Sequence, residues 1–154
     1  MILKSVRLQN IRSYVSEEVR FPSGSLMLSG DIGAGKSTIL HAIEFALFGI
    51  RSDLKGEGLL RHGKDEGFVE LNLSVEGKEI TIKRGLKRKN KSVQQDTGHM
   101  IFNGAKEDLT AVELKTKVLD LLGYPKELVS KSKSLVYRYT VYTPQEQMKE
   151  ILFD

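Results

Sequence analysis

Alternation of apolar and polar residues predicts several β-strands in the first two thirds of the chain. Residues 4–8 and 15–21 alternate in this way, and residues 68–75 and 79–83 repeat the pattern on either side of a Glu-Gly turn. Strict alternation places one face of a strand in a core and the other in water, which is typical of antiparallel sheets. We therefore predict two N-terminal strands and a β-hairpin with one solvated face.

Two longer segments have the apolar spacing of helices. Residues 37–48 are apolar on almost every side and end at Gly49, which predicts a buried helix with a glycine stop. Residues 110–122 carry apolar side chains at helical spacing and are closed by Gly123 and Pro125. This second segment predicts an amphipathic helix.

Weaker patterns predict the remaining elements. The apolar run 26–29 favours a strand buried on both faces, and residues 50–66 have the charge and glycine content of a loop. Further along the chain we predict a small edge strand at 99–102, a helix at 126–133, a strand at 135–142, and a final helix at 145–152 that follows the capping pair Thr143-Pro144. Strands and helices in this mixture favour an α/β fold.

Composition narrows the class of protein. The chain has 154 residues, of which 40% are hydrophobic and 29% charged, and this fits one soluble domain of ordinary size. No apolar run is long enough for a membrane span, the first residues lack the pattern of a secretory signal, and cysteine is absent. We therefore expect an intracellular protein without disulfides or cysteine-based metal sites.

The net charge of +4 comes from one segment of the chain. No acidic residue interrupts a group of six basic residues: Lys83, Arg84, Lys87, Arg88, Lys89 and Lys91. Such a group is either the solvated end of a hairpin or a surface for the phosphate backbone of DNA, which would be bound without reading base sequence. The sequence alone favours neither interpretation.

The strongest chemical signal lies between the predicted buried strand and the predicted buried helix. Residues 30–37 read G-D-I-G-A-G-K-S and match the phosphate-loop pattern G-x-x-x-x-G-K-[ST] in full. The glycines let the backbone turn tightly, so that several N–H groups and the following helix terminus face one anion. Lys36 would add a positive charge at the β- and γ-phosphates, and the Ser37 hydroxyl is a suitable ligand for Mg²⁺. We therefore predict a site for ATP and Mg²⁺.

The residues that hydrolysis would require beside this loop are missing. Hydrolysis needs a carboxylate at the end of a buried strand to hold Mg²⁺ and orient water. The two candidate segments for such a strand fail: residues 71–76 alternate as a half-exposed strand does, and residues 118–120 lie inside a helical pattern. The motif Ser-Gly-Gly does not occur either. Residues 90–93 lack the aspartate of a guanine-reading N-K-x-D motif. The chain is therefore predicted to bind nucleotide with only part of the catalytic machinery.

Two other functions remain open from these residues. The first is a complete small P-loop kinase, which would need a lid with catalytic arginines and a second acidic site. The second is a non-catalytic nucleic-acid-binding module whose phosphate loop holds a structural nucleotide. ATP hydrolysis by this chain alone would favour the kinase or a simple ATPase.

Several segments, in order, resemble the N-terminal half of the ABC-type ATPase head of SMC-like DNA-repair proteins, the SbcC/Rad50 family. The segments that carry the resemblance are L-Q-N-I-R-S-Y at 8–14, the phosphate loop, L-R-H-G at 60–63, the hairpin at 68–84, and V-Y-T-P-Q-E-Q at 141–147, which is similar to the glutamine loop. One position departs from the family: Ile32 stands where asparagine is usual, so no side-chain hydrogen bond to the phosphates is expected there.

The resemblance implies a fold and a set of partners. Residues 1–154 would form the N-terminal lobe of a P-loop ABC-type head, an α/β lobe with a mixed sheet, an antiparallel β-hairpin subdomain and short helices. Residues 143–154 would begin the helix that leads into a coiled coil. The C-terminal half of the same ATPase would supply the missing carboxylates and Ser-Gly-Gly. Two such heads would then sandwich ATP and act with an Mre11 or SbcD-type nuclease on DNA, where ATP hydrolysis controls head dimerisation and end processing at double-strand breaks.

The resemblance and the motif together assign residue roles. Lys36 and Gln145 are expected to be catalytic, and Ser37 and Gln145 to contact the metal ion. The nucleotide-binding residues are expected to be Arg12, Ser13, Asp31, Ile32, Gly33, Ala34, Gly35, Lys36, Ser37 and Thr38. In a protein of this family the six basic residues between 83 and 91 would contact DNA.

Overall fold

The computed structural model describes residues 2–21, 36–50 and 56–123, and side chains at the start of the first helix from Thr38 onward. The described part contains one seven-stranded sheet in the order β2-β1-β3-β4-β6-β7, with β5 paired to the far end of β4. The strands are β1 (Ile2–Ile11), β2 (Tyr14–Arg20), β3 (Glu66–Val75), β4 (Lys78–Lys89), β5 (Ser92–Gln95), β6 (Gly98–Phe102) and β7 (Ala105–Leu109). All of these pairings are antiparallel.

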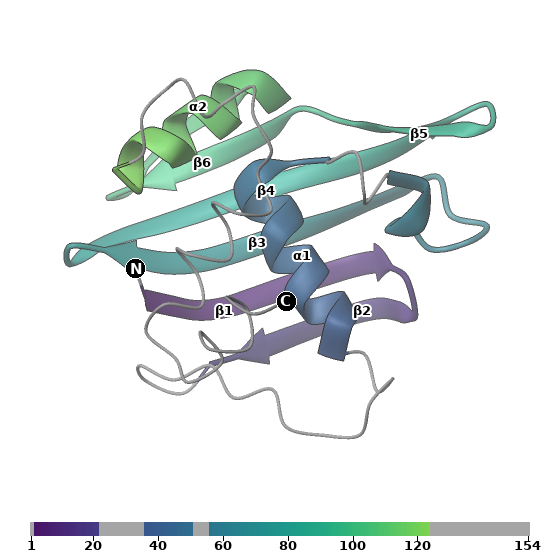
Figure 1. Cartoon of the computed structure of the whole chain (residues 1–154), viewed down its shortest axis with the longest axis horizontal. Helices are drawn as coiled ribbons and strands as arrows, with labels where there is room; N and C mark the ends of the chain where they lie inside the picture. Colours follow the sequence, from purple (N-terminus) through teal and green to yellow (C-terminus); the bar gives the residue numbers. More distant parts are fainter. Residues whose placement is uncertain (1, 22–35, 51–55, 124–154) are drawn as a thin grey trace, which may run out of the picture.

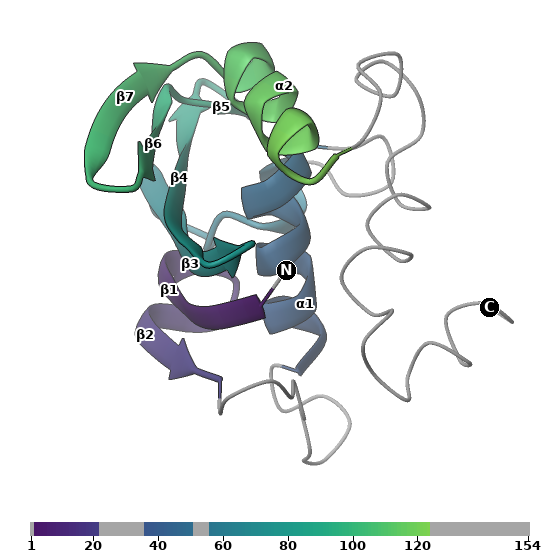
Figure 2. The ribbon, with the colours of Figure 1, turned by 90° about the vertical axis from the view of Figure 1, so that its left-hand side faces the viewer.

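Both α-helices lie on the same face of this sheet, as Figures 1 and 2 show. They are α1 (Lys36–Phe48) and α2 (Ala111–Leu121), and a single 3₁₀ turn, η1 (Gly56–Gly58), precedes β3. Helix α1 crosses the sheet from the β2 side toward β4, where its end meets α2. No described helix has the length and apolar character that a membrane crossing requires.

Alternation along the strands creates the buried face that α1 covers. Successive side chains of a strand point to opposite faces, so every second residue of β1, β3 and β4 enters the core. The buried apolar side chains from these three strands are Val6, Leu8, Ile11, Val69, Leu71, Leu73, Ile80, Ile82 and Leu86. Helix α1 contributes Ile43, Phe45, Leu47 and Phe48 to the same cluster. Burial of these apolar side chains fixes the helix to the sheet.

The structure confirms the main predicted elements of the first two thirds of the chain. The N-terminal strands, the hairpin predicted at 68–75 and 79–83, and both helices are present, and Gly49 and Gly123 follow the helices with the positive φ angles of 81° and 82° that favour glycine. The other predicted elements, at 26–29, 126–133, 135–142 and 145–152, lie outside the described residues.

Several boundaries and the edge position of the strand at 99–102 were predicted wrongly, and two strands, β5 and β7, were not predicted. Strand β4 continues to Lys89 instead of ending at Lys83, and the predicted loop 50–66 contains η1 and the first residue of β3. The strand at 98–102 is internal, because β7 pairs with its free side. Strands β5 and β7 each bury a single residue, so their sequences carry no alternating apolar signal.

The buried guanidinium of Arg84 corrects one predicted DNA contact. Arg84 faces the core and is only 2% exposed. Its Nε donates to Ala46 O at 2.8 Å, and its terminal nitrogens donate to Leu47 O at 3.2 Å, Ala111 O at 3.3 Å and Gln95 Oε1 at 3.4 Å. With all three nitrogens occupied inside the core, Arg84 is not available to DNA. Its contacts instead fasten the C-terminal end of α1 to β4, β5 and the start of α2.

The charge of Arg84 is compatible with this position. Burial lowers the pKa of the Arg84 guanidinium to about 9 by desolvation, which leaves it charged at neutral pH. The last carbonyls of a helix carry partial negative charge, so a cation is favourable at the end of α1. The buried charge is thereby compensated by carbonyl oxygens, two of which lie in the last turn of α1, where carbonyls lack a partner within the helix.

Helix α2 begins with a capping box. The N-cap residue Thr110 accepts a hydrogen bond from Glu113 N through its hydroxyl at 3.3 Å, and the Glu113 carboxylate accepts one from Thr110 N at 2.9 Å. These two bonds satisfy backbone donors that a helix start leaves free. Leu114, Val118 and Leu119 then enter the core, so the cap fixes where the helix meets β6 and β7.

We predict that Arg84→Ala destabilises the fold by about 3–5 kcal/mol, because it leaves a cavity and unpaired carbonyls in the core. The neighbouring Lys83→Ala is the matched control, since Lys83 lies on the opposite face of the same strand. The control is expected to cost less than about 1 kcal/mol. Urea denaturation of both variants measures the difference, and equal costs would contradict the role assigned to Arg84.

The capping box also predicts a dependence of stability on pH. Hydrogen bonds from the backbone and side chain of Thr110 lower the pKa of Glu113 below its usual value of 4.5. A carboxylate with a lowered pKa in the folded state stabilises the fold above its unfolded pKa, and this contribution is lost as the pH falls through the folded value. We expect the melting temperature of the native chain to exceed that of Glu113→Gln at neutral pH, and the gap to narrow on acidification. A gap that stays constant would contradict this prediction.

Candidate functional site

The phosphate-loop motif runs directly into helix α1. Helix α1 begins at Lys36, and Ser37 follows in its first turn, as the motif requires for a loop whose anion faces a helix N-terminus. Thr38 is 5% exposed and sits at the start of the buried part of α1. The motif residues 31–35 and Gln145 lie outside the described residues, and their predicted roles stay predictions.

Arg12 and Ser13 form the turn between β1 and β2. Arg12 has a φ angle of 48°, and Asn10, two residues earlier, has a φ angle of 53°. Asparagine visits this left-handed conformation readily, whereas arginine adopts it only when the surroundings support it. Arg12 N donates to Leu59 O at 2.7 Å, and Arg12 Nε donates to Gly58 O at 2.8 Å. The predicted nucleotide ligand Arg12 is thus anchored at both its backbone and its side chain.

A second segment, residues 58–61, is hydrogen-bonded to this turn. Arg61 N donates to Asn10 O, and Arg61 Nη1 donates to Arg12 O, both at 2.9 Å. Leu60 forms a β-bridge with Ile11, which is fully buried. The sequence marks 60–63 only through a family resemblance and does not reveal how Arg61 supports the turn. No local pattern could have revealed it, since its partner is 49 positions away.

Strand alternation divides the six basic residues among three environments. Lys87, Lys89 and Lys91 are exposed at the end of the β4–β5 hairpin, and Arg88 lies beside them with its Nε bonded to Lys64 O at 3.1 Å. Lys83 lies on the solvent-facing side of the sheet, with its Nζ 4.2 Å from the centre of the Phe68 ring. Together with buried Arg84, this arrangement leaves the four residues Lys87, Arg88, Lys89 and Lys91 as a basic hairpin end.

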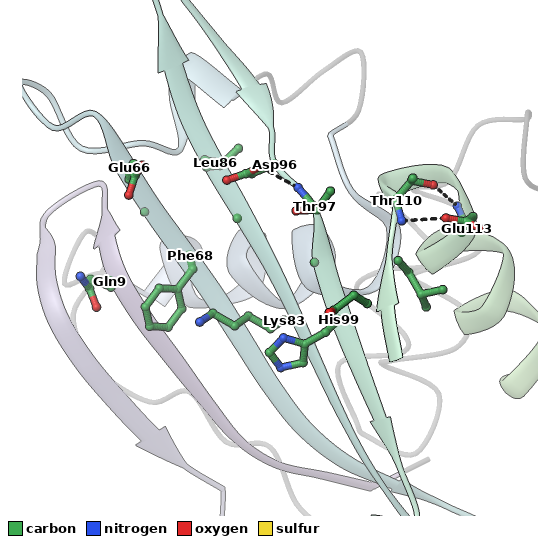
Figure 3. Close-up of a pocket in the computed structure, with 15 residues that line it drawn as sticks. Gln9, Glu66, Phe68, Lys83, Leu86, Asp96, Thr97, His99, Thr110 and Glu113 are labelled. Atoms are coloured by element: carbon green, nitrogen blue, oxygen red, sulfur yellow. Dashed lines mark hydrogen bonds between the residues drawn. The ribbon is translucent and has the colours of Figure 1, made fainter. Parts of the chain in front are cut away.

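A hollow of about 560 Å³ lies between β3, β4, β6 and the start of α2, shown in Figure 3. Two of the carboxylates that line it accept hydrogen bonds from the backbone: Asp96 from Thr97 N, and Glu113 from Thr110 N at the start of α2. Burial and the nearby lysines lower the pKa of His99, which favours its neutral form. Among the residues that the structure describes, Lys83 is the one predicted site residue that lines this hollow.

The described residues offer no separate metal centre. Within 2–21, 36–50 and 56–123, no group of three or more histidine, aspartate or glutamate side chains could hold a metal ion. A site with one hydroxyl ligand and phosphate oxygens is the donor set that Mg²⁺ accepts, because it keeps several of its waters. The position of Ser37 at the start of α1 fits this donor set.

Comparison with protein families and known proteins gives consistent matches. Residues 5–154 match the family described as an AAA domain. The chain is 35% identical over 118 residues to the DNA double-strand break repair Rad50 ATPase of Thermoplasma volcanium, which covers 73% of this chain and 13% of the relative. It is 31% identical over 153 residues to the protein of the same name from Thermoplasma acidophilum, over 99% of this chain and 16% of the relative.

A solved structure supports the fold. The recombination mediator protein RecF with ATP, of the RecFOR pathway, superposes with a TM-score of 0.52 at 24% identity, over 68% of this chain and 28% of that protein. This likeness concerns the fold alone. The chain spans 13% and 16% of the lengths of the two Thermoplasma relatives, so it corresponds to a small part of each.

Proposed function

Because this chain belongs to the AAA-domain family and corresponds to the N-terminal head region of SMC-like Rad50-type ATPases, we propose that it is the ATP-binding N-terminal half of a DNA double-strand-break repair ATPase. The observation that carries this proposal is the complete phosphate-loop motif at 30–37, which continues into a helix buried against the sheet. A buried helix gives the loop a rigid support, which phosphate binding by backbone N–H groups requires.

The residues of the loop have distinct roles in this proposal. The backbone of residues 31–35 surrounds the phosphates, with Ile32 contributing only its backbone, and Lys36 neutralises charge on them. Ser37 and Gln145 hold Mg²⁺, which supplies positive charge next to the phosphates when bound. Arg12, with Ser13 beside it, contacts the nucleotide from the β1–β2 turn, and Thr38 completes the start of α1.

Hydrolysis requires a second half in this proposal. The sequence lacks Ser-Gly-Gly and a strand that ends in the acidic pair of an ATPase. The C-terminal half of the same ATPase supplies both, and two heads close on ATP. Residues 143–154 lead into the coiled coil between the halves, and an Mre11 or SbcD-type nuclease acts with the assembly inside the cell.

The basic hairpin end is the proposed DNA surface. Lys87, Lys89 and Lys91 are exposed, and they lie on one hairpin end together with Arg88. Lysine and arginine side chains bind phosphates without reading bases, which suits an enzyme that meets DNA ends of any sequence. Lys83 is less suited, because its ammonium group lies over Phe68.

We predict that ATP affinity depends on Lys36 and that hydrolysis depends on the C-terminal half. Lys36→Ala is expected to raise the Kd for MgATP by about 10–100-fold, because it removes hydrogen bonds from a charged donor. Lys78→Ala, an exposed lysine at the start of β4, is the matched control. Calorimetric titration measures binding, and phosphate release measures hydrolysis with and without the C-terminal half.

Each alternative function has its own outcome in this experiment. Hydrolysis by this chain alone would contradict the half-site and favour a complete P-loop enzyme. Binding without hydrolysis, even after the C-terminal half is added, would favour a non-catalytic module. Unchanged affinity in Lys36→Ala would contradict the phosphate-loop site itself.

The proposed DNA surface predicts salt-dependent binding that a triple substitution weakens. Replacing Lys87, Lys89 and Lys91 by glutamine should lower the affinity of the assembled head for duplex DNA at low salt, and reduce the slope of log K against log salt by about 2–3. Replacing Lys78, Lys106 and Lys117 removes the same charge elsewhere and is the control. Equal losses in the two variants would show that only net charge matters and would contradict a local surface.

A further inference from the structure

Arg61 supports the β1–β2 turn through two hydrogen bonds, one from its backbone and one from its side chain. The backbone N–H of Arg61 donates to Asn10 O, and its guanidinium donates through Nη1 to Arg12 O, each at 2.9 Å. Arg12 in this turn and Asn10 near the end of β1 have positive φ angles, 48° and 53°. Arg61 therefore binds the carbonyl of each left-handed residue, on either side of the buried Ile11.

The neighbourhood of the turn leaves little room for it to relax. A Cβ atom on Gly67 would lie 2.7 Å from Gln9 O and 2.9 Å from Asn10 O, so β3 passes directly against the turn. Asn10 Nδ2 also donates to Glu66 O at 2.9 Å. Left-handed conformations of ordinary residues persist only where the surroundings fix them, and they gather at binding sites. The guanidinium of Arg61 is the side-chain donor that holds the carbonyl of Arg12.

The Arg12 side chain is oriented as well as its backbone. Its Nε is bonded to Gly58 O at 2.8 Å, and among the described residues its two terminal nitrogens have no hydrogen-bond partner. A guanidinium held at one nitrogen presents the remaining donors in a fixed plane, which suits bidentate binding of a phosphate. The direction of that plane depends on the backbone conformation of Arg12.

We propose that Arg61 is a positioning residue for nucleotide binding, which acts by holding the Arg12 backbone in the conformation that directs the Arg12 guanidinium at the nucleotide. This inference rests on the proposed function, in which Arg12 is a nucleotide ligand. Arg61 itself need not touch the nucleotide. Its side chain has a donor committed to a carbonyl, and its effect passes through Arg12.

A double-mutant cycle in the assembled head, this chain with its C-terminal half, tests the proposal. Arg61→Met keeps the stem of the side chain and removes the donor, and Arg12→Asn removes the guanidinium with a residue that tolerates positive φ. Arg61→Met should raise the Kd for MgATP by about 5–10-fold, as the loss of one hydrogen bond would. In the Arg12→Asn background the same substitution should change the Kd by less than about 2-fold.

Two further variants separate positioning from a general loss of structure. Arg61→Lys retains a cationic donor and should bind MgATP within about 2-fold of the native head. Arg20→Met removes an exposed arginine from the far end of β2 and should leave affinity unchanged. Melting temperatures are measured throughout, because a purely structural role would lower stability and affinity alike in both backgrounds. Should Arg61→Met fail to fold, Arg61→Gln takes its place in the cycle.

The outcomes distinguish this inference from the proposed function. Additive effects of the Arg12 and Arg61 substitutions would overturn it and indicate direct contact of Arg61 with the nucleotide. Native affinity in Arg61→Met would also overturn it, with Arg12 remaining a ligand if Arg12→Asn binds weakly. Native affinity in Arg12→Asn would remove the role of Arg12, and the inference with it. A native head that binds no MgATP would contradict the proposed function as a whole.

Discussion

Helix α1 starts inside the phosphate-loop motif and lies across the buried face of the sheet, and the guanidinium of Arg84 holds its far end there. The apolar contacts from β1, β3 and β4 set the distance between helix and sheet, but apolar contacts are not directional. The hydrogen bonds of Arg84 to the last carbonyls of α1 are directional and fix the position of that end of the helix relative to β4. A loop that binds phosphate through backbone N–H groups needs such a support, because its geometry is inherited from the helix that follows it.

A second constraint acts at the C-terminal end of β1, where the chain turns into β2. Asn10 at the end of β1 and Arg12 in the turn have left-handed conformations, and both are held by residues from two other segments, 58–61 and 66–67. The strain is local, and the contacts that offset it come from distant parts of the sequence. Arg12 is therefore held by its own chain at both its backbone and its side chain, and in the proposed function this orientation would lower the entropy lost on nucleotide binding.

The basic segment shows how a strand redistributes a run of charge. Residues that are neighbours in sequence alternate between the two faces of the sheet, so Lys83 lies on the solvent-facing side and Arg84 lies in the core. Only where β4 leaves the body of the sheet do successive residues, from Lys87 onward, become accessible together. The same alternation brings Lys83 to the Phe68 ring, because Phe68 lies on the solvent-facing side of β3.

The sequence alone determined the presence of the hairpin, of both helices with the glycines that follow them, and of the phosphate-loop motif, because each has a signal within a short window: period-two or helical spacing, a glycine stop, or a motif of fixed spacing. It also carried the family resemblance. Only the tertiary structure decided that Arg84 belongs to the core, that β6 is an internal strand and that Arg61 supports Arg12. Those facts depend on contacts between residues far apart in the chain. Strands β5 and β7 form because β4 and β6 offer them backbone hydrogen-bonding groups, and a short sequence window contains no signal for such pairing.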